Sequence, residues 1–370
     1  MHSSLKGRLV SLDVFRGIAI SLMILTYDLS GVTYFTAFQH ADWHGWTFAD
    51  LIFPFFIFIV GVAIPFSLGS RLARGENRKK LLVRVSRRLV ILFVLGLIVN
   101  GFPVFDLSTI RVMGVLQRIG LCYFFASLVF LSFKERGQFV VAVLLSVFYW
   151  MLMTLVPVPG YGAGVLTREG NLAAYVDNLL LRGHLFTGAW DPEGLLSTIP
   201  AVATALMGVL AGQHLRSDKG SMEKAVNLFF FGTLCVVVGF LWNSWFPINK
   251  NLWSSSFVAF TGGMALVFLA VCYYLIDVRK WGFWTKPFVI FGTNAIAVYV
   301  LSMLVGLTLI HVNVALADGS SVSLKNFVLE NFFTSWAGHV NGVLLYAVAY
   351  LMLWLGIMAI LYKKGIFIKV

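Results

Sequence analysis

Ten runs of apolar residues dominate this 370-residue chain and constrain its fold more than any other feature. They cover approximately 9–29, 48–70, 89–105, 112–133, 138–157, 195–215, 225–246, 253–276, 287–310 and 341–362. A helix that crosses the hydrocarbon core of a bilayer needs roughly 20 apolar residues, and only the third run is clearly short. Backbone groups inside a bilayer must be paired within their own segment, which favours helices. The sequence therefore predicts an all-α polytopic membrane protein with about ten transmembrane helices in a single domain, 1–370.

The composition excludes several other classes of protein. Apolar residues make up 59% of the chain and charged residues only 12%, whereas about a quarter of the residues in a soluble domain are charged. An ordinary soluble enzyme, a disordered chain and a protein with a single membrane anchor are all inconsistent with these values. Cys122, Cys235 and Cys272 lie inside apolar runs, so we expect neither a disulfide framework nor a thiolate metal site.

The positive charges predict an orientation in the membrane. An even number of spans puts both termini on one side, and that side would receive 21 Lys and Arg residues against five on the other. Because cytoplasmic loops carry the excess of Lys and Arg, we expect both termini in the cytoplasm and the chain in the cell (inner) membrane. The long connections 30–47, 158–194 and 311–340 would then lie outside, together with most of the histidines.

The connection 71–88 is the most basic segment, with eight cations, among them Arg71, Arg84 and Arg87, against the single acid Glu76. Such a loop commonly determines topology and touches anionic lipid. A second interpretation is a mouth that binds a phosphate-bearing ligand arriving from the cytoplasm. Nucleic acid is not expected as a partner, because no aromatic platform or recognisable binding fold accompanies the charge.

The densest polar cluster runs from Gln39 to Trp46 and is followed by Asp50 at the opening of the second apolar run. A histidine exchanges a proton near neutral pH, and a neighbouring carboxylate orients its ring. His40 and His44 are four residues apart but lack the glutamate of the HExxH pattern, so they are a weak metal signal. An interfacial loop whose polar residues merely face water explains the same cluster. Trp43 belongs equally well to the aromatic belt of the interface.

Several polar residues fall inside apolar runs, where charges are costly and usually pair or face a cavity. Asp13 and Arg16 are three residues apart and can meet on one helical face, as a structural pair or as ligand-binding groups. Arg118 is predicted to face the interior, where it binds an anion or pairs with a carboxylate such as Asp50. Asn294 and Asn100 are better explained as hydrogen bonds between helices.

Six blocks of the sequence resemble the heparan-α-glucosaminide N-acetyltransferase family, within the broader transmembrane acyltransferases. They are SLDVFRGIAI (11–20), HADWHGWTFADLIFPFFIFIVGVAI (40–64), RVMGVLQRIGLCYF (111–124), DPEGLLSTIPAVATALMGVLAGQ (191–213), NKNLWSSSF (249–257) and GTNAIAVYV (292–300). The blocks follow the family's order over most of the chain. The sequence contains no Asn-x-Ser/Thr sequon, which favours a prokaryotic source. We expect a prokaryotic-type member without the lumenal N-terminal extension of the animal enzymes.

The resemblance implies a multi-span enzyme that transfers acetyl from cytoplasmic acetyl-CoA to the amino group of a glucosamine unit across the membrane, without a metal. The family's essential histidine falls on His40, and His44 occupies a variable position. The family's upstream Asn has no counterpart in the stretch 26–29, where Asp28 is the nearest polar residue. A homodimer is also an expectation from the family alone.

On this interpretation His40 is the general base or a transient acetyl carrier, and Asp50 or Asp42 holds its ring. The expected candidates for oxyanion stabilisation or substrate binding are Asn294, Arg118, Trp43 and His44. Those for acetyl-CoA binding are Asp13, Arg16, Arg71, Arg84 and Arg87. Two alternatives remain open: a proton-coupled transporter of amino sugars or related solutes that uses Asp13, Asp50, His40 and Arg118, and an O-acyltransferase of an envelope glycan.

Overall fold

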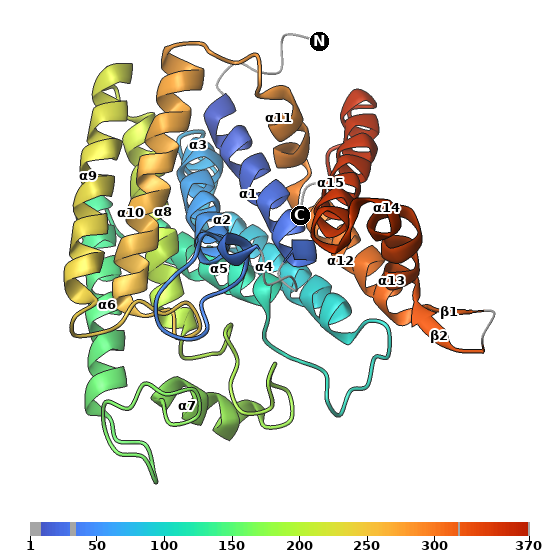
Figure 1. Cartoon of the computed structure of the whole chain (residues 1–370). Helices are drawn as coiled ribbons and strands as arrows, with labels where there is room; N and C mark the ends of the chain where they lie inside the picture. The colour runs from blue at the N-terminus through green and yellow to red at the C-terminus, as the bar shows by residue number, and fades with distance from the viewer. Residues whose placement is uncertain (1–8, 30–34, 317–318, 369–370) are drawn as a thin grey trace.

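The computed structural model describes residues 9–29, 35–316 and 319–368, and these residues are almost entirely helical (Figure 1). Lys6, Arg8 and Lys369, which contribute to the cation count of the predicted inner side, lie outside the described residues. The helices are α1 (Val10–Leu29), α2 (Phe48–Ile64), α3 (Ser70–Leu72), α4 (Arg78–Gly101), α5 (Val115–Ser132), α6 (Glu135–Leu155), α7 (Leu172–Leu181), α8 (Thr198–Arg216), α9 (Ser221–Trp242), α10 (Ser255–Cys272), α11 (Lys286–Thr293), α12 (Ala295–His311), α13 (Leu324–Leu329), α14 (Ser335–Ala337) and α15 (His339–Lys363).

Shorter elements connect these helices. π-Helical segments follow α2, α10 and α13 at Pro65–Gly69, Tyr273–Val278 and Glu330–Thr334, and a 3-10 turn covers Thr36–Phe38. Strands β1 (Asn313–Ala315) and β2 (Ser321–Ser323) form an antiparallel hairpin in which Val314 lies opposite Val322. The all-α polytopic class predicted from the sequence is therefore confirmed.

Eight helical segments of the described chain are long and apolar enough to cross a membrane. A ninth candidate is the pair α11 and α12, which the sequence presents as one run, 287–310, but which bends by 81° at Asn294. The remaining apolar run, 89–105, lies largely in α4. The first half of α4 carries too many cations for the helix to count among the apolar membrane-spanning segments.

The region 71–88 is not the loop that the sequence predicted. Most of it is helical, because α3 continues the α2 axis to Leu72 and α4 already begins at Arg78. Lys and Arg are good helix formers, and the Asn77 side chain accepts a hydrogen bond from Lys79 N at 2.9 Å, which caps α4. The cations therefore line the first turns of a helix.

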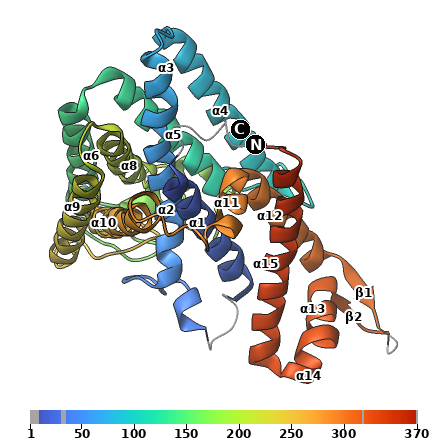
Figure 2. The same ribbon diagram turned by 90° about the horizontal axis from the view of Figure 1, so that it is seen from above.

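The helices form two groups on either side of a centre (Figures 1 and 2). Helices α6, α8, α9 and α10 lie on one side, α12 to α15 lie on the other, and α1, α2 and α11 lie between them. Glycines allow two close crossings near the centre. A Cβ on Gly208 of α8 would lie 2.1 Å from Phe58 O of α2, and one on Gly292 of α11 would lie 2.0 Å from Asp13 O of α1. Small residues permit such backbone contact between membrane helices.

Apolar side chains cover the outer surfaces of the peripheral helices. Helix α9 exposes a run of phenylalanines, Phe229, Phe230 and Phe231, and α6 exposes Phe139, Leu144 and Phe148. In water such a surface would drive aggregation, whereas in a bilayer it contacts lipid tails. The exposed faces of α6 and α9 are thus the expected lipid-facing surfaces of a membrane protein.

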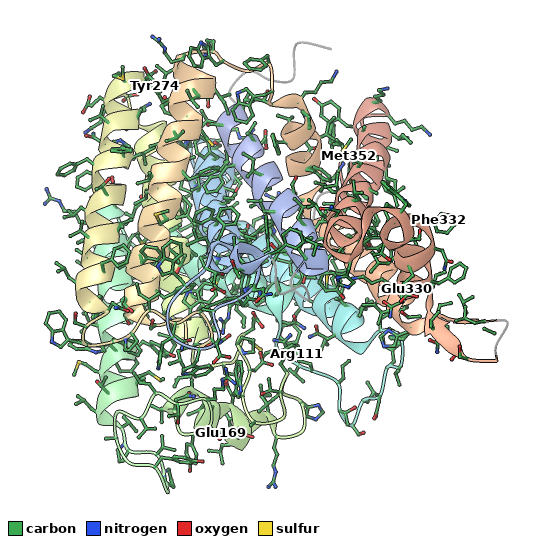
Figure 3. All side chains as sticks on the ribbon, in the orientation of Figure 1. Arg111, Glu169, Tyr274, Glu330, Phe332 and Met352 are labelled. Carbon is green, nitrogen blue, oxygen red and sulfur yellow. The ribbon has the colours of Figure 1, made fainter. Side chains whose placement is uncertain are left out.

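Four connections that are distant in sequence meet at one end of the bundle. Gly45 N donates to Ile248 O at 2.7 Å, and Val112 N donates to His184 O at 3.2 Å. Trp43 Nε1 donates to Leu166 O at 2.7 Å. Figure 3 shows Arg111 and Glu169 at this end and Tyr274 at the opposite one. These are the connections that the alternation of spans placed on one side of the membrane, and their contacts build the candidate site.

Candidate active site

The start of α2 positions the first catalytic candidates. Thr47 is the N-cap of this helix, and Asp50, three residues later, accepts a hydrogen bond from Thr47 N at 3.0 Å through Oδ2. This capping box pairs backbone donors that the first turn of a helix leaves free. The same Oδ2 accepts from Ala41 N at 3.0 Å, so Asp50 also fixes the loop before the helix. Its side chain is only 1% exposed.

The other oxygen of Asp50 holds the ring of His40. Asp50 Oδ1 lies 2.7 Å from His40 Nδ1. A carboxylate only accepts hydrogen bonds, so this contact places the proton of a neutral His40 ring on Nδ1 and leaves the lone pair on Nε2. The His40 side chain is 48% exposed. The arrangement is that of an oriented general base or nucleophile.

Lys250, from the connection between α9 and α10, lies against the same ring. Its Nζ is 3.0 Å from His40 Nδ1 and 3.1 Å from Nε2. An atom equidistant from both nitrogens in the ring plane would overlap Cε1 between them, so Nζ lies over one face of the ring. The in-plane lone pair of Nε2 is therefore not taken by the lysine. Burial lowers the pKa of Lys250, and Asp50, whose Oδ1 is 3.6 Å from Nζ, and Glu193 partly oppose that shift.

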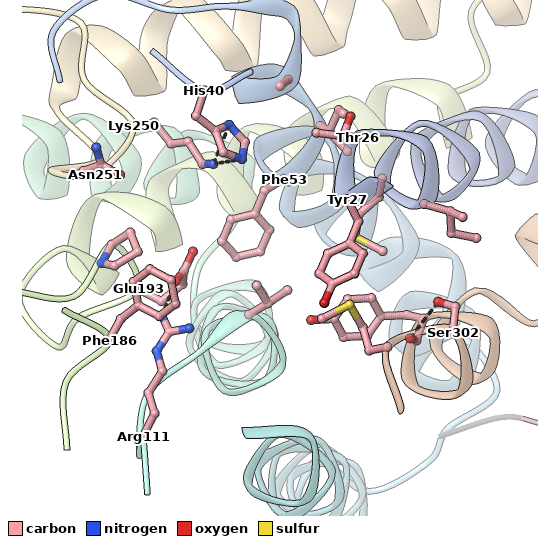
Figure 4. Close-up of a pocket in the computed structure, with 18 of the residues that line it drawn as sticks. Thr26, Tyr27, His40, Phe53, Arg111, Phe186, Glu193, Lys250, Asn251 and Ser302 are labelled. Atoms are coloured by element: carbon pink, nitrogen blue, oxygen red, sulfur yellow. Dashed lines mark hydrogen bonds and ion pairs between the residues drawn. The ribbon is translucent and has the colours of Figure 1, made fainter. Parts of the chain in front are cut away.

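A cavity of about 370 Å³ opens beside these residues (Figure 4). Its volume falls within the range of roughly 300–1,000 Å³ that small-molecule sites occupy. One end is lined by charged and aromatic groups: His40, Arg111, Phe186, Trp190, Glu193 and Lys250. Thr26, Tyr27 and Ser302 lie at the other end (Figure 4), and the lining also includes Met23, Tyr299 and Met303. Phe53 lies between the two ends (Figure 4).

Arg111 organises the charged end of the cavity. It binds Asp191 in a bidentate manner, with Nε to Oδ2 at 2.8 Å and Nη2 to Oδ1 at 2.6 Å, and Nη2 also donates to Glu193 Oε2. These carboxylates raise the pKa of Arg111 although burial opposes the shift. Burial would raise the pKa of Glu193, but Arg111, Arg118 and Lys250 lower it below its usual value. Both groups are therefore charged at neutral pH.

The turn that carries Asp191 and Glu193 is held from behind by two buried side chains. Arg118 of α5, 0% exposed, donates to Pro192 O at 2.9 Å and Gly194 O at 3.0 Å, and also to the Ser197 hydroxyl. Asp177 of α7 accepts from Leu195 N at 2.8 Å, and burial raises its pKa to about 6. These bonds fix the position of Glu193 relative to the cavity.

Comparison with known proteins agrees with the resemblance described above. A model of the catalytic region of heparan-alpha-glucosaminide N-acetyltransferase matches residues 8–241. The chain is 34% identical over 358 residues to the human protein of that name, covering 80% of this chain and 53% of the human one. It is 31% identical over 430 residues to the mouse protein, covering 98% and 61% of the two chains.

This chain belongs to the heparan-alpha-glucosaminide N-acetyltransferase catalytic family. It spans between half and two thirds of the length of the curated relatives it matches. The region matched by the family model includes His40, Asp50, Arg111 and Glu193 but ends before Lys250.

Within this family member, three residues of the polar cluster 39–46 do not touch the cavity as expected. Asp42 does not hold the His40 ring; its side chain is 96% exposed and pairs with Arg168 at 2.5 Å. Trp43 is fixed by its bond to Leu166 O and packs against Trp190, with ring centroids 5.2 Å apart. His44 Nδ1 lies 3.3 Å from Asn249 Nδ2, so it joins two loops. None of the three lines the cavity.

The two residues expected to stabilise an oxyanion are engaged elsewhere. Arg118 bonds the turn 192–197 and does not pair with Asp50. Asn294, at the bend between α11 and α12, donates to Ile366 O at 3.1 Å and accepts from Ile368 N at 2.8 Å. It holds the end of the described chain and is not among the cavity residues. Asn100 donates to Arg111 O at 3.0 Å and so supports a loop.

Asp28, the nearest polar residue to the family's upstream asparagine, accepts a hydrogen bond from Lys325 Nζ at 2.8 Å. Its neighbours Thr26 and Tyr27 line the cavity, but Asp28 does not. Because α1 is helical here, successive side chains point in different directions, and that of Asp28 is directed towards α13.

The residues expected to bind acetyl-CoA lie away from the cavity. Arg16 contacts Asp13 at 3.4 Å and donates to Gly292 O at 3.2 Å, across the contact of α1 with α11. Arg71 and Arg84 both bind Glu76 at 3.0 Å, and Arg87 is exposed on α4. Asp50 and Arg71 are separated by 21 residues along α2 and its continuation, which corresponds to roughly 30 Å.

Sequence reasoning missed three residues of the charged end, namely Lys250, Glu193 and Arg111. Lys250 is 210 positions from His40 in the sequence, so no local pattern connects the two. A usable signal was present, however. All three residues lie in blocks that carry the family resemblance, and all three are charged groups at the outer ends of apolar runs.

Proposed function

We propose that this chain is a transmembrane N-acetyltransferase that moves acetyl from cytoplasmic acetyl-CoA to the amino group of a glucosamine-type sugar on the outer side of the membrane. The observation that carries the proposal is the His40–Asp50 pair, because His40 lines a cavity together with Lys250 and Glu193. The transferred acetyl group and the glucosaminide acceptor are proposed from the names of the human and mouse relatives.

The proposed reaction needs one proton acceptor and one stabilised oxyanion. The neutral amine nitrogen attacks the thioester carbonyl, and His40 Nε2 takes one of its protons as the carbon–nitrogen bond forms. The carbon–sulfur bond breaks, the CoA thiolate leaves, and the proton held by His40 returns to that sulfur. Asp50 stabilises the transient imidazolium. In the two-step variant, His40 Nε2 itself attacks the thioester carbonyl, the CoA thiolate leaves, and Nε2 carries the acetyl group. The amine then attacks the acetyl carbon, Nε2 leaves, and the amine proton passes to the thiolate.

Lys250 is suited to stabilise the oxyanion. Its Nζ lies 3.1 Å from Nε2 and over the ring face, so a carbonyl carbon approached by a nucleophile at Nε2 brings its oxygen within reach of the ammonium. A charge placed before the reaction stabilises the developing negative charge without reorganisation. Lys250 thus takes the role that the sequence suggested for Asn294 or Arg118.

The two ends of the cavity suit the two substrates. The slender acyl-carrying arm of acetyl-CoA needs an apolar path with some hydrogen-bonding groups, which Met23, Thr26, Tyr299 and Met303 provide. The cations of α3 and α4 suit the anionic nucleotide of acetyl-CoA on the cytoplasmic side, roughly the thickness of a hydrocarbon core away from Asp50. The positive-inside rule supports this sidedness.

The test uses the full chain in proteoliposomes with labelled acetyl-CoA inside and glucosamine outside. Mass spectrometry of the sugar should show N-acetylglucosamine with wild type and none with His40→Ala. His311→Ala is the matched control, since His311 is exposed and its ring contacts Leu307 O of its own helix. Uptake of unmodified sugar would overturn the proposal in favour of a transporter, and an O-acetylated product would favour a glycan O-acyltransferase.

A further inference from the structure

We infer that Glu193 is a binding site for the ammonium group of the acceptor, and so selects cationic amino sugars over neutral sugars and over the acetylated product. This inference rests on the proposed function and deepens it by assigning the acceptor subsite to one end of the cavity.

The Glu193 carboxylate is buried but only half satisfied. The residue is 6% exposed and lines the cavity. Among the described residues, Arg111 binds its Oε2, whereas Oε1 has no hydrogen-bond partner and is not sealed inside the protein. Oε1 is therefore open to the cavity, and a carboxylate oxygen binds a charged donor more strongly than a neutral one. A ligand cation in the cavity can therefore bind Oε1 directly.

Glu193 is the carboxylate that the cavity exposes to a ligand. The cations at this end are Arg111, Arg118 and Lys250, and the carboxylates are Asp50, Asp177, Asp191 and Glu193. Arg111 is already paired with Asp191 through two hydrogen bonds. Of these carboxylates only Glu193 lines the cavity, so it is the carboxylate that a ligand ammonium group can reach.

The walls beside Glu193 fit a sugar ring. Phe186 is fixed by Arg111, whose guanidinium carbon lies 4.5 Å from the ring centroid, and Trp190 is fixed by Trp43. Aromatic rings pack against the apolar C–H face of a sugar, while a side-chain amide such as that of Asn251 bonds hydroxyl groups. Figure 4 shows Glu193 and Phe186 on one side of this end, with His40 and Lys250 across from them.

The chemistry gives Glu193 a role in turnover as well as in binding. The acceptor binds as an ammonium ion, releases one proton to water and reacts as the neutral amine. Its second proton passes through His40 to the CoA sulfur, so the product is a neutral amide. The amide has no charge for Glu193 to attract. The same carboxylate therefore binds the substrate and releases the product.

The test measures binding without acetyl-CoA, by isothermal titration calorimetry on the full chain in nanodiscs. Glu193→Gln keeps the shape and an oxygen for Arg111 but removes the charge. We expect its Kd for glucosamine to rise at least tenfold, with the Kd for glucose and for N-acetylglucosamine changed less than twofold. Glu169→Gln, which removes an exposed carboxylate from the same end, should bind all three sugars like wild type.

Equal affinity of wild type and Glu193→Gln for glucosamine would overturn the inference. Unchanged binding of glucose shows that Glu193→Gln is folded. If Glu193→Gln does not fold, Glu193→Asp replaces it, since it keeps the charge on a shorter side chain. The affinity of Glu193→Asp for glucosamine should fall while its affinity for glucose persists. A chain that binds glucosamine through Glu193 but never acetylates it would refute the proposed function alone. A chain that acetylates glucosamine with an unchanged KM in Glu193→Gln would refute this inference alone.

Discussion

At the scale of single residues, the Asp50 carboxylate connects the start of a membrane helix to the histidine of the cavity. Its Oδ2 caps α2 and fixes the preceding loop, and its Oδ1 orients His40. A single side chain thus couples the formation of the helix to the tautomer of the proposed base.

Asp50→Asn should lower kcat roughly 100-fold or more, because an amide NH₂ facing Nδ1 favours the tautomer whose lone pair is on the wrong nitrogen. The loss of cap strength should cost about 1 kcal/mol of stability, which thermal unfolding separates from the kinetic effect. Asp42→Asn is the control, since Asp42 is exposed and pairs only with Arg168 in the described structure. Equal activity of both variants would contradict the role of Asp50.

Lys250→Met should lower kcat about 100-fold, the usual effect of removing one oxyanion donor. The pH profile distinguishes this role from others. Burial lowers the pKa of Lys250, and the ammonium exists only below that pKa, so wild-type activity should fall as the pH rises through it, below the usual 10.5. Lys250→Arg stays charged and should extend activity to higher pH. Activity that rises with pH through this range would instead indicate a neutral lysine acting as a base.

The sequence predicted part of this arrangement. The contact between His40 and Asp50 follows from their spacing around the start of a helix, because ten residues of loop and first turn fold back on themselves. Lys250 and Glu193 come from connections that follow other helices, and their approach depends on how α8, α9 and α10 pack. The hydrophobic periodicity within one helix does not predict how separate helices pack against each other.

At the scale of elements, the crossing of α2 and α8 depends on backbone contact. Gly208→Leu should destabilise the chain by about 1–3 kcal/mol or more, because its Cβ would overlap Phe58 O and two backbones would have to separate. Gly356→Leu is the matched control, since a Cβ there meets nothing within 4 Å. Thermal unfolding followed by size-exclusion chromatography measures the difference. A melting temperature of Gly208→Leu equal to that of Gly356→Leu would show that the crossing is not tight.

Hydrophobicity predicted where helices occur but not how each one is shaped. The ten apolar runs all fall on helical segments, since burial of backbone groups in a bilayer requires them. Hydrophobicity did not predict the bend at Asn294, because Asn294 is held there by hydrogen bonds with the backbone of Ile366 and Ile368, which are distant in the sequence. The extent of α4 was also missed, because its first half is cationic and yet helical.

At the scale of the whole molecule, the charge distribution makes a prediction about orientation. A cysteine introduced at Glu169 should react with a membrane-impermeant maleimide in right-side-out vesicles, whereas one at Lys219 should react only after permeabilisation. Both Glu169 and Lys219 are exposed in the structure, so a cysteine at either position is accessible to the reagent. The native Cys122 and Cys272 are buried, and the half-buried Cys235 is replaced by serine to keep the background low. The reverse labelling pattern would contradict the assignment of the termini to the cytoplasm.

The cavity draws its lining from almost the entire length of the chain, from Met23 to Tyr350. A polypeptide released from the ribosome after residue 241 would contain the region matched by the family model, yet Lys250, Tyr299 and Tyr350 would be missing from the cavity wall. We therefore expect prematurely terminated chains to be inert even when they insert into the membrane. No half of the chain contains the complete cavity, so we expect activity only after the last helices have been inserted.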